Sequence, residues 1–298
     1  MTDRHRLILL VGATGSGKTD LSICLAQHYG APILSVDSRQ IYRGLSIGTA
    51  QPTEFQQQSV DHHFVASVDL TEDFSCGKFE TQALALLKQL FIKHSTVLAV
   101  GGSGLYAQAL CNGMDDLPEV DTSLRDLLRA RLTTEGIAKL AAELKDLDPT
   151  FYDVVDHNNS ARILRALEIC LQTGRPYSSF RTGAVHQRDF DIIKIGIDMD
   201  RTALYARIDQ RVDTMIASGL EQEARKVYPF RQLHALQTVG YKEMFDYFDG
   251  KISLAEAIVL IKRNSRHYAK RQFTWFRRDP AIRWFSPQNI EAIFEYIG

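Results

Sequence analysis

The glycine-rich segment from Gly12 to Thr19 carries the clearest chemical signal in the chain. It reads G-A-T-G-S-G-K-T, a full match to the phosphate-binding pattern G-x-x-x-x-G-K-[ST]. In such a loop the backbone N–H groups turn inward around phosphate oxygens, and the helix that follows directs its positive end at the same place. We predict that a di- or triphosphate binds here, with a catalytic charge on Lys18 and Mg²⁺ on the Thr19 hydroxyl. The predicted phosphate-binding set is Gly12, Ala13, Thr14, Gly15, Ser16, Gly17, Lys18 and Thr19.

Two further polar segments follow apolar runs in the same way. Asp37 opens the segment D-S-R-Q-I-Y, and a carboxylate facing a phosphate site can bind Mg²⁺ through water or accept a proton. The segment Gly101–Tyr106, G-G-S-G-L-Y, brings the Ser103 hydroxyl and bare backbone to a similar position. If the apolar runs are parallel strands, all of these groups converge at the carboxyl edge of one sheet.

A basic and aromatic block lies near the end of the chain, between Lys262 and Arg278. It contains several arginines and lysines interleaved with aromatic rings, and no acidic residue falls between them at helical spacing. Such a run is most often a solvated helix face. Positive charge combined with flat rings is also typical of surfaces that bind single-stranded or loop RNA. Both interpretations stay open on these residues alone.

The elements that must position these groups alternate between strand and helix. The pattern predicts a parallel sheet of the P-loop NTPase type flanked by helices, which places the chain in the α/β class. Predicted strands cover Leu7–Val11, Pro32–Val36, Thr96–Val100 and Ile192–Met199, and predicted helices cover Thr19–His28, Phe79–His94, Leu204–Ala217 and 254–271. Residues 114–189 are largely helical in pattern, which predicts an inserted all-helical subdomain within a core formed by residues 1–113 and 190–298.

Composition sets wider bounds on the class of protein. The chain has 298 residues, of which 45% are hydrophobic, and its formal net charge of −1 favours no particular partner. Its four cysteines form no C-x-x-C pair, so a structural zinc site is unsupported. The apolar stretch before Gly12 is too short for a signal peptide or a membrane span. We expect a soluble cytoplasmic protein that has no membrane partner and acts as a monomer.

Together these segments resemble the tRNA dimethylallyltransferase family. The similarity runs almost end to end, and its most specific parts are Asp37–Tyr42 and the block Tyr268–Arg277. The family usually has proline at position 13 and threonine at position 103, where this chain has Ala13 and Ser103. Other shared segments are Gly48-Thr49-Ala50, Asp61-His62-His63, Arg162 with Arg165–Glu168, and Gln237 with Gly240–Glu243.

The resemblance implies a reaction and a set of roles. Dimethylallyl diphosphate would bind in the phosphate loop with Mg²⁺, and the N6 amine of adenosine 37 in a tRNA anticodon stem-loop would attack its allylic carbon. Asp37 would accept the amine proton and Ser103 would assist, after the adenine leaves the base stack. The implied tRNA-binding residues are Asp37, Ser38, Arg39, Gln40, Ser103, Arg125, Arg162, Arg165, Gln237, Gly240, Tyr241, Lys242, Lys270, Arg271, Gln272, Thr274, Trp275 and Arg277.

Two rival functions fit the phosphate loop. A small-molecule or nucleotide kinase would use it to hold ATP, with Asp37 as base and the helical insertion as a lid. A GTPase-like switch is disfavoured because the chain has no Asn-Lys-x-Asp motif, and ATP-driven work because no apolar run ends in an acidic pair. A kinase has no evident need for the basic-aromatic block. The adjacent pair His62-His63 could bind a metal, but neighbouring side chains point in different directions, which favours a structural or RNA-contact role.

Overall fold

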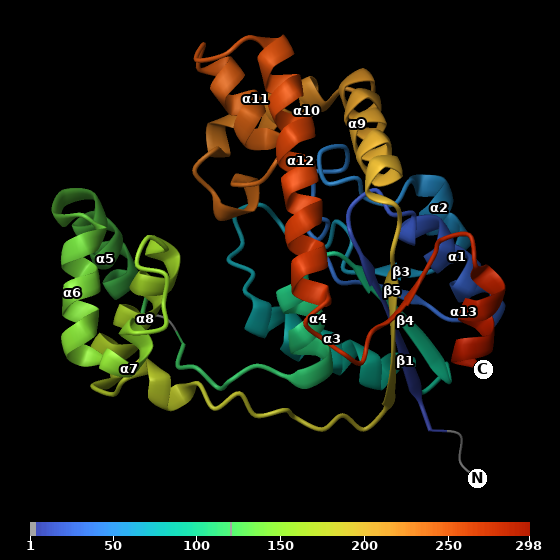
Figure 1. The fold of residues 1–298 in the computed structure, drawn as a ribbon, viewed down its shortest axis with the longest axis horizontal. Helices are drawn as coiled ribbons and strands as arrows, with labels where there is room; N and C mark the ends of the chain where they lie inside the picture. The colour runs from blue at the N-terminus through green and yellow to red at the C-terminus, as the bar shows by residue number, and fades with distance from the viewer. Residues whose placement is uncertain (1–3, 120) are drawn as a thin grey trace. The chain divides into compact units, whose positions relative to one another are not determined.

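A single six-stranded parallel sheet organises the larger part of the chain. The computed structural model describes residues 4–119 and 121–298 (Figure 1). The strands lie in the order β3-β2-β4-β1-β5-β6, and every neighbouring pair is parallel. Their bounds are β1 (Arg6–Gly12), β2 (Ile33–Ser35), β3 (His62–His63), β4 (Thr96–Gly101), β5 (Asp191–Ile197) and β6 (Arg283–Phe285). The predicted α/β class with a P-loop-type parallel sheet is confirmed.

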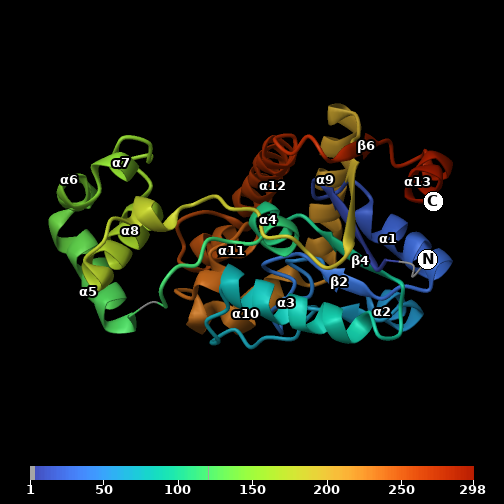
Figure 2. The ribbon, with the colours of Figure 1, turned by 90° about the horizontal axis from the view of Figure 1, so that it is seen from below.

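Helices cover both faces of this sheet. On one face α1 (Lys18–Tyr29) and α13 (Ile290–Ile297) pack on Ile8 and Leu10 of β1 (Figure 2). On the other face Leu7, Leu9 and Val11 meet a larger core. Because side chains alternate along a strand, the continuous apolar run of β1 is buried on both sides. The helices of the second face are α3 (Cys76–Leu90), α4 (Gly104–Asn112), α10 (Leu220–Val227), α11 (Tyr241–Phe248) and α12 (Leu254–Phe276).

Two elements lie close to the carboxyl edge of the sheet. Helix α9 (Arg201–Ala217) follows β5 and packs beside α12, while the short α2 (Glu54–Ser59) precedes β3. Figure 1 shows α9 and α12 side by side. Short 3₁₀ turns occupy Tyr228–Phe230 and His234–Leu236 in the same unit, and Tyr177–Phe180 elsewhere.

Residues Asn112–His186 form a separate compact unit within the chain. It is helical, with α5 (Thr122–Glu135), α6 (Ile137–Leu147), α7 (Pro149–Tyr152) and α8 (Ser160–Thr173). Its own core includes Leu128, Leu140, Leu144, Ile163 and Leu167, all fully buried. The other unit comprises residues 1–111 and 187–298, so its borders lie two to three residues from the predicted ones.

Several elements differ from the sequence-based prediction. The strand at His62–His63 and the edge strand β6 are short, and neither was predicted. Helix α3 begins three residues before the predicted Phe79, because Ser75 caps it by accepting a hydrogen bond from the Lys78 N–H. Helix α12 continues past Arg271 to Phe276, so the aromatic tail of the basic block is helical.

Candidate active site

The phosphate loop links the end of β1 to the start of α1. Gly15 and Gly17 adopt φ values of 80° and 90°, which favour glycine and let consecutive N–H groups face one concave side. The Lys18 ammonium donates a hydrogen bond to the Ala13 carbonyl at 2.7 Å. The buried Ser16 hydroxyl has no hydrogen-bond partner within the residues that the structure describes. The loop therefore holds an unused donor inside a cradle suited to an anion.

Helix α9 adds two guanidinium groups that the sequence analysis missed. Arg207 lies over the loop, since a Cβ atom on Gly17 would stand 3.5 Å from Arg207 Nη2. Arg211, one turn later, acts electrostatically on Lys18. Burial, reinforced by the Arg211 charge and opposed by Asp37, lowers the pKa of Lys18 to about 7. Burial also lowers the pKa of Arg211, and Asp37 opposes that shift. This concentration of positive charge suits a ligand that carries several negative charges.

The carboxylate of Asp37 lies close enough to Lys18 and Arg211 to act on both charges. It comes two residues after β2, and its Oδ1 accepts the N–H groups of Arg39 at 2.9 Å and Gln40 at 3.2 Å. These bonds fix the direction of the carboxylate while its other oxygen stays available. A half-buried carboxylate beside a cluster of cations can accept a proton from a bound substrate.

Ser103 joins the loop after β4 to the Asp37 segment. Its hydroxyl accepts the Ser38 N–H at 2.9 Å and lies 3.2 Å from the Ser38 hydroxyl. It also hydrogen-bonds the phenol of Tyr268 on α12. Thus the loop after β2, the loop after β4 and helix α12 each contribute a hydroxyl to one small cluster next to Asp37.

One face of α12 packs against the same loops. Gln272 is buried, accepts the Thr14 N–H at 2.8 Å and donates to the Gly102 carbonyl at 2.9 Å. A Cβ atom on Gly104 would overlap the Trp275 indole ring, so the helix approaches this loop closely. Gln272 therefore couples the phosphate loop to the Ser103 loop through a single side chain.

A buried carboxylate, Glu223, supports the segment that follows Asp37. Its oxygens accept the Ile47 and Gly48 N–H groups, both at 2.8 Å, and the Tyr241 hydroxyl at 2.6 Å. The neighbouring carbonyls of Thr49 and Ala50 accept the side-chain amide of Gln40. Glu223 of α10 therefore holds the loop that Gln40 contacts. The sequence did not predict this role of Glu223.

The chain is similar to known proteins along nearly its whole length. The family model described as IPP transferase matches residues 40–279. The chain belongs to the IPP transferase family. It is 50% identical over 294 residues to tRNA dimethylallyltransferase 2 of Parabacteroides distasonis, covering 99% of this chain and 98% of that protein.

Solved structures agree with the family assignment. The tRNA isopentenylpyrophosphate transferase of Bacillus halodurans is 37% identical with a TM-score of 0.72, over 99% of this chain and 96% of that one. A eukaryotic dimethylallyltransferase, captured acting on tRNA, is 26% identical with a TM-score of 0.76, over 91% of this chain and 69% of that one. The resemblance inferred from the motifs is confirmed.

Part of the predicted tRNA-binding set is exposed in this member of the IPP transferase family. The exposed residues of the larger unit are Gln237, Lys242, Lys270, Arg271, Thr274, Trp275 and Arg277, and Arg162 is exposed in the helical unit. Arg125 and Arg165 instead bind the buried carboxylate of Glu168, at 3.0 and 3.1 Å. Both arginines stabilise the helical unit, and RNA contact by them stays a prediction.

Four other residues of the predicted tRNA-binding set have contacts inside the protein. Tyr241 is fully buried and donates to Glu223, so its side chain is not a surface for RNA. Gly240 is buried, and its N–H caps α11 through Glu243. The amides of Gln40 and Gln272 are bound to protein backbone. All four residues belong to segments shared with the family, and all four make hydrogen bonds inside the protein.

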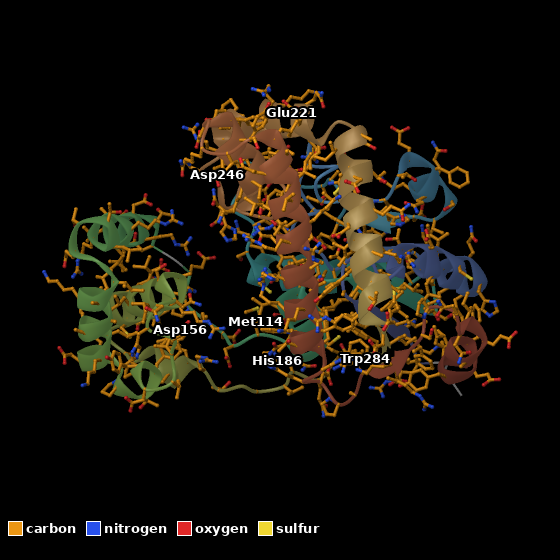
Figure 3. The ribbon with its side chains drawn as sticks, turned by 45° about the horizontal axis from the view of Figure 1, so that its top comes forward. Met114, Asp156, His186, Glu221, Asp246 and Trp284 are labelled. Atoms are coloured by element: carbon orange, nitrogen blue, oxygen red, sulfur yellow. The ribbon has the colours of Figure 1, made fainter. Side chains whose placement is uncertain are left out.

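The basic block is less positive than its sequence indicates. Arg266 and Lys262 pair with Asp209 and Asp213 of α9, and Arg277 pairs with Asp198 after β5. Arg277 also lies over Trp284, which Figure 3 labels near the end of α12. The acidic partners are on a neighbouring element, which a search at helical spacing within the block could not find.

No cluster of three or more potential metal-ligating side chains occurs within residues 4–119 and 121–298. His62 and His63 form the short strand β3 against β2, which is a structural role. Thr19 is exposed at the start of α1 and offers a single hydroxyl. A Mg²⁺ ion at Thr19 therefore stays a prediction.

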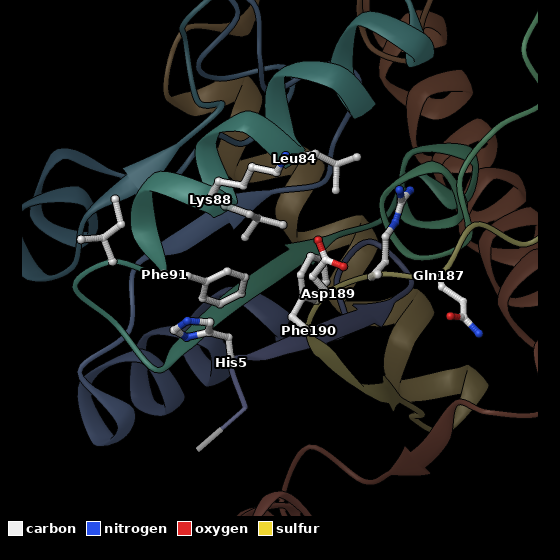
Figure 4. A pocket seen from close by; sticks show the side chains of 10 residues that line it. His5, Leu84, Lys88, Phe91, Gln187, Asp189 and Phe190 are labelled. Atoms are coloured by element: carbon white, nitrogen blue, oxygen red, sulfur yellow. The ribbon is translucent and has the colours of Figure 1, made fainter. Parts of the chain in front are cut away.

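A cavity of about 470 Å³ lies at the opposite edge of the sheet (Figure 4). His5, Leu87, Phe91 and Phe190 line it, near the amino ends of β1 and β5. No predicted site residue lines this cavity, so it is separate from the phosphate loop. Among the described residues, no helix combines the length and hydrophobicity needed to cross a bilayer.

Proposed function

We propose that this protein transfers a dimethylallyl group from dimethylallyl diphosphate to the N6 amine of adenosine 37 in the tRNA anticodon loop. The observation that carries the proposal is the placement of Asp37 beside Lys18 and Arg211, at the carboxyl edge of the sheet. A proton acceptor thus adjoins a cationic cradle. That arrangement suits a substitution in which an anion departs while an amine loses its proton.

On the donor side, the diphosphate would occupy the phosphate loop. Lys18, Arg207 and Arg211 would stabilise the negative charge that grows on the diphosphate oxygen as the carbon–oxygen bond breaks. The bond's electron pair leaves with the diphosphate. Thr19 would hold a Mg²⁺ ion through its hydroxyl, and such an ion would supply additional charge neutralisation.

On the acceptor side, the adenine amine would face Asp37. A bond forms between N6 and the allylic carbon, and the displaced N6 proton passes to the Asp37 carboxylate. Because the exocyclic amine of adenine is a weak nucleophile, holding it close to the carbon contributes much of the rate. Ser103 positions this region through its bond to the Ser38 N–H. The adenine must unstack from the anticodon loop to reach it.

The exposed residues on the solvent side of α12 would bind the RNA. Within the described residues, no carboxylate pairs with Lys270 or Arg271, and Trp275 is partly exposed beside them. Cationic groups beside an exposed ring suit the phosphates and unstacked bases of a tRNA loop. This surface is the main feature that a small-molecule kinase would not need.

The test is incubation with labelled dimethylallyl diphosphate and an anticodon stem-loop that carries adenosine at position 37. We expect label in the RNA and release of diphosphate, and no label when position 37 is guanosine. A parallel reaction contains γ-labelled ATP in place of the prenyl donor. Transfer of γ-phosphate without prenylation would favour the kinase and contradict the proposal.

A further inference from the structure

Three side chains on one face of α12 contact the loop after β4. Tyr268, Gln272 and Trp275 are spaced four and three residues apart, so they project from the same side of the helix. Gln272 binds the Gly102 carbonyl and Trp275 packs on Gly104. The residue between these two glycines is Ser103, and the Tyr268 phenol meets its hydroxyl.

The hydroxyl cluster leaves a hydrogen-bond donor facing the site. The Ser103 hydroxyl accepts the Ser38 N–H and can donate its own proton to the Tyr268 oxygen. In that arrangement the phenolic proton of Tyr268 has no acceptor assigned within the described residues. Burial, with Asp37 nearby, raises the pKa of Tyr268 to about 12, so the phenol keeps its proton at neutral pH. Asp37 and Tyr268 therefore form an acceptor and a donor next to each other.

That pair matches the Watson–Crick edge of adenine. Adenine presents an N6–H donor beside the N1 acceptor, whereas guanine presents an O6 acceptor beside an N1–H donor. A carboxylate acceptor with a neighbouring hydroxyl donor is complementary to the first base and opposed to the second. An unpaired or opposed polar group costs far more than a missing apolar contact, which makes such a pair selective.

We propose that Tyr268 is a specificity-determining residue that donates its phenolic hydrogen bond to N1 of the target adenine while Asp37 accepts from N6. This inference rests on the proposed function. It gives Tyr268 direct contact with the substrate, and it gives Gln272 and Trp275 the task of fixing the helix face that presents it.

The experiment pairs a protein change with an RNA change. Wild type and Tyr268→Phe are each assayed on stem-loops with adenosine or 1-deazaadenosine at position 37; the second base lacks N1. Tyr268→Phe keeps the ring and removes only the hydroxyl. We expect roughly 10-fold lower kcat/KM for Tyr268→Phe on adenosine, the usual size of losing one hydrogen bond in a closed site.

The decisive quantity is the ratio between the two RNAs. Removing N1 also changes the reactivity of the amine, but that effect is common to both proteins and cancels. If the phenol contacts N1, the penalty for 1-deazaadenosine should be about 10-fold smaller in Tyr268→Phe than in wild type. Tyr296→Phe on α13, on the far side of the sheet, should keep the full wild-type penalty.

Equal penalties in wild type and Tyr268→Phe would overturn the inference while leaving the proposed function standing. Wild type that prenylates neither RNA would overturn both. Unchanged diphosphate binding by Tyr268→Phe establishes that the variant is folded, so a loss of activity cannot be ascribed to misfolding.

Discussion

Helices α9 and α12 lie side by side over the same edge of the sheet, yet α9 supplies charged groups to the site and the inward face of α12 supplies neutral ones. Helix α9 brings the guanidinium groups of Arg207 and Arg211 to the phosphate loop. The inward face of α12 brings neutral groups, the phenol of Tyr268 and the amide of Gln272, to the Ser103 loop. Charge is concentrated at the loop proposed to hold the diphosphate, and neutral hydrogen bonds are concentrated at the loop proposed to receive the adenine.

Ion pairs between α9 and α12 hold the two helices against each other. Arg266 of α12 pairs with Asp209 of α9, and Lys262 pairs with Asp213. These ion pairs join the helices along their contact, while Gln272 joins α12 to the phosphate loop itself. The donor half and the acceptor half are therefore built on a common frame, although their chemistry differs.

The largest effect is expected from removing the proton acceptor. Asp37→Ala should lower kcat by about 10²-fold or more, because no other group in the cluster can take the N6 proton. The dissociation constant for the stem-loop should change little. Single-turnover kinetics and RNA titration measure the two quantities separately.

Asp37→Asn serves as the matched control, because its amide oxygen can still accept the Arg39 and Gln40 N–H groups. It should be nearly as slow as Asp37→Ala. Recovery of activity in Asp37→Asn would assign Asp37 a purely positional role, and a large loss of RNA affinity in either variant would remove it from proton transfer.

The donor half is tested by Arg211→Ala. Loss of a guanidinium beside Lys18 should lower kcat/KM for dimethylallyl diphosphate by roughly 10- to 100-fold. Affinity for inorganic diphosphate, measured by calorimetry, should fall with it, and RNA affinity should not. Arg201→Ala removes an exposed arginine from the first turn of the same helix and is the control. Equal effects of the two changes would indicate a general loss of charge.

The sequence predicted the functional residues that directly follow a strand of the sheet. The phosphate loop, Asp37 and Ser103 each follow a strand of the parallel sheet, and topology alone brings such positions together. Their convergence could be predicted because it depends on strand direction and not on side-chain packing.

Contacts between distant elements were the part that could not be predicted. Arg207 and Arg211 sit in a helix with no motif, and their role depends on how α9 packs on the loop. Tyr241 belongs to a segment shared with the family, yet its partner Glu223 lies eighteen residues earlier in the chain. A shared motif marks a residue as important without saying whether it faces the substrate or the core.

A smaller effect is expected from replacing Gln272, which links the phosphate loop to the Ser103 loop. Gln272→Leu keeps the approximate volume but leaves the partly buried Thr14 N–H and the buried Gly102 carbonyl without Gln272 as a partner. Each unpaired group costs about 1–3 kcal/mol, so the free energy of unfolding and the diphosphate affinity should both fall. Val259→Ala at an exposed position of α12 should leave both unchanged. Lower stability with normal diphosphate binding would show that Gln272 does not shape the phosphate loop.

The smallest effect is expected from replacing single cations of α12, and it should differ between Arg271 and Arg266. Arg271 has no carboxylate partner in the described chain, while Arg266 is already paired with Asp209. Arg271→Ala should therefore weaken stem-loop binding by about 3- to 10-fold and reduce the slope of log Kd against log salt by about 0.7, the value for one phosphate contact on a single strand. Arg266→Ala should change the slope much less. If the two slopes change equally, Arg266 contributes to RNA binding as much as Arg271 does, despite its ion pair with Asp209. The distinction between a side of α12 that contacts α9 and a side that binds RNA would then be wrong.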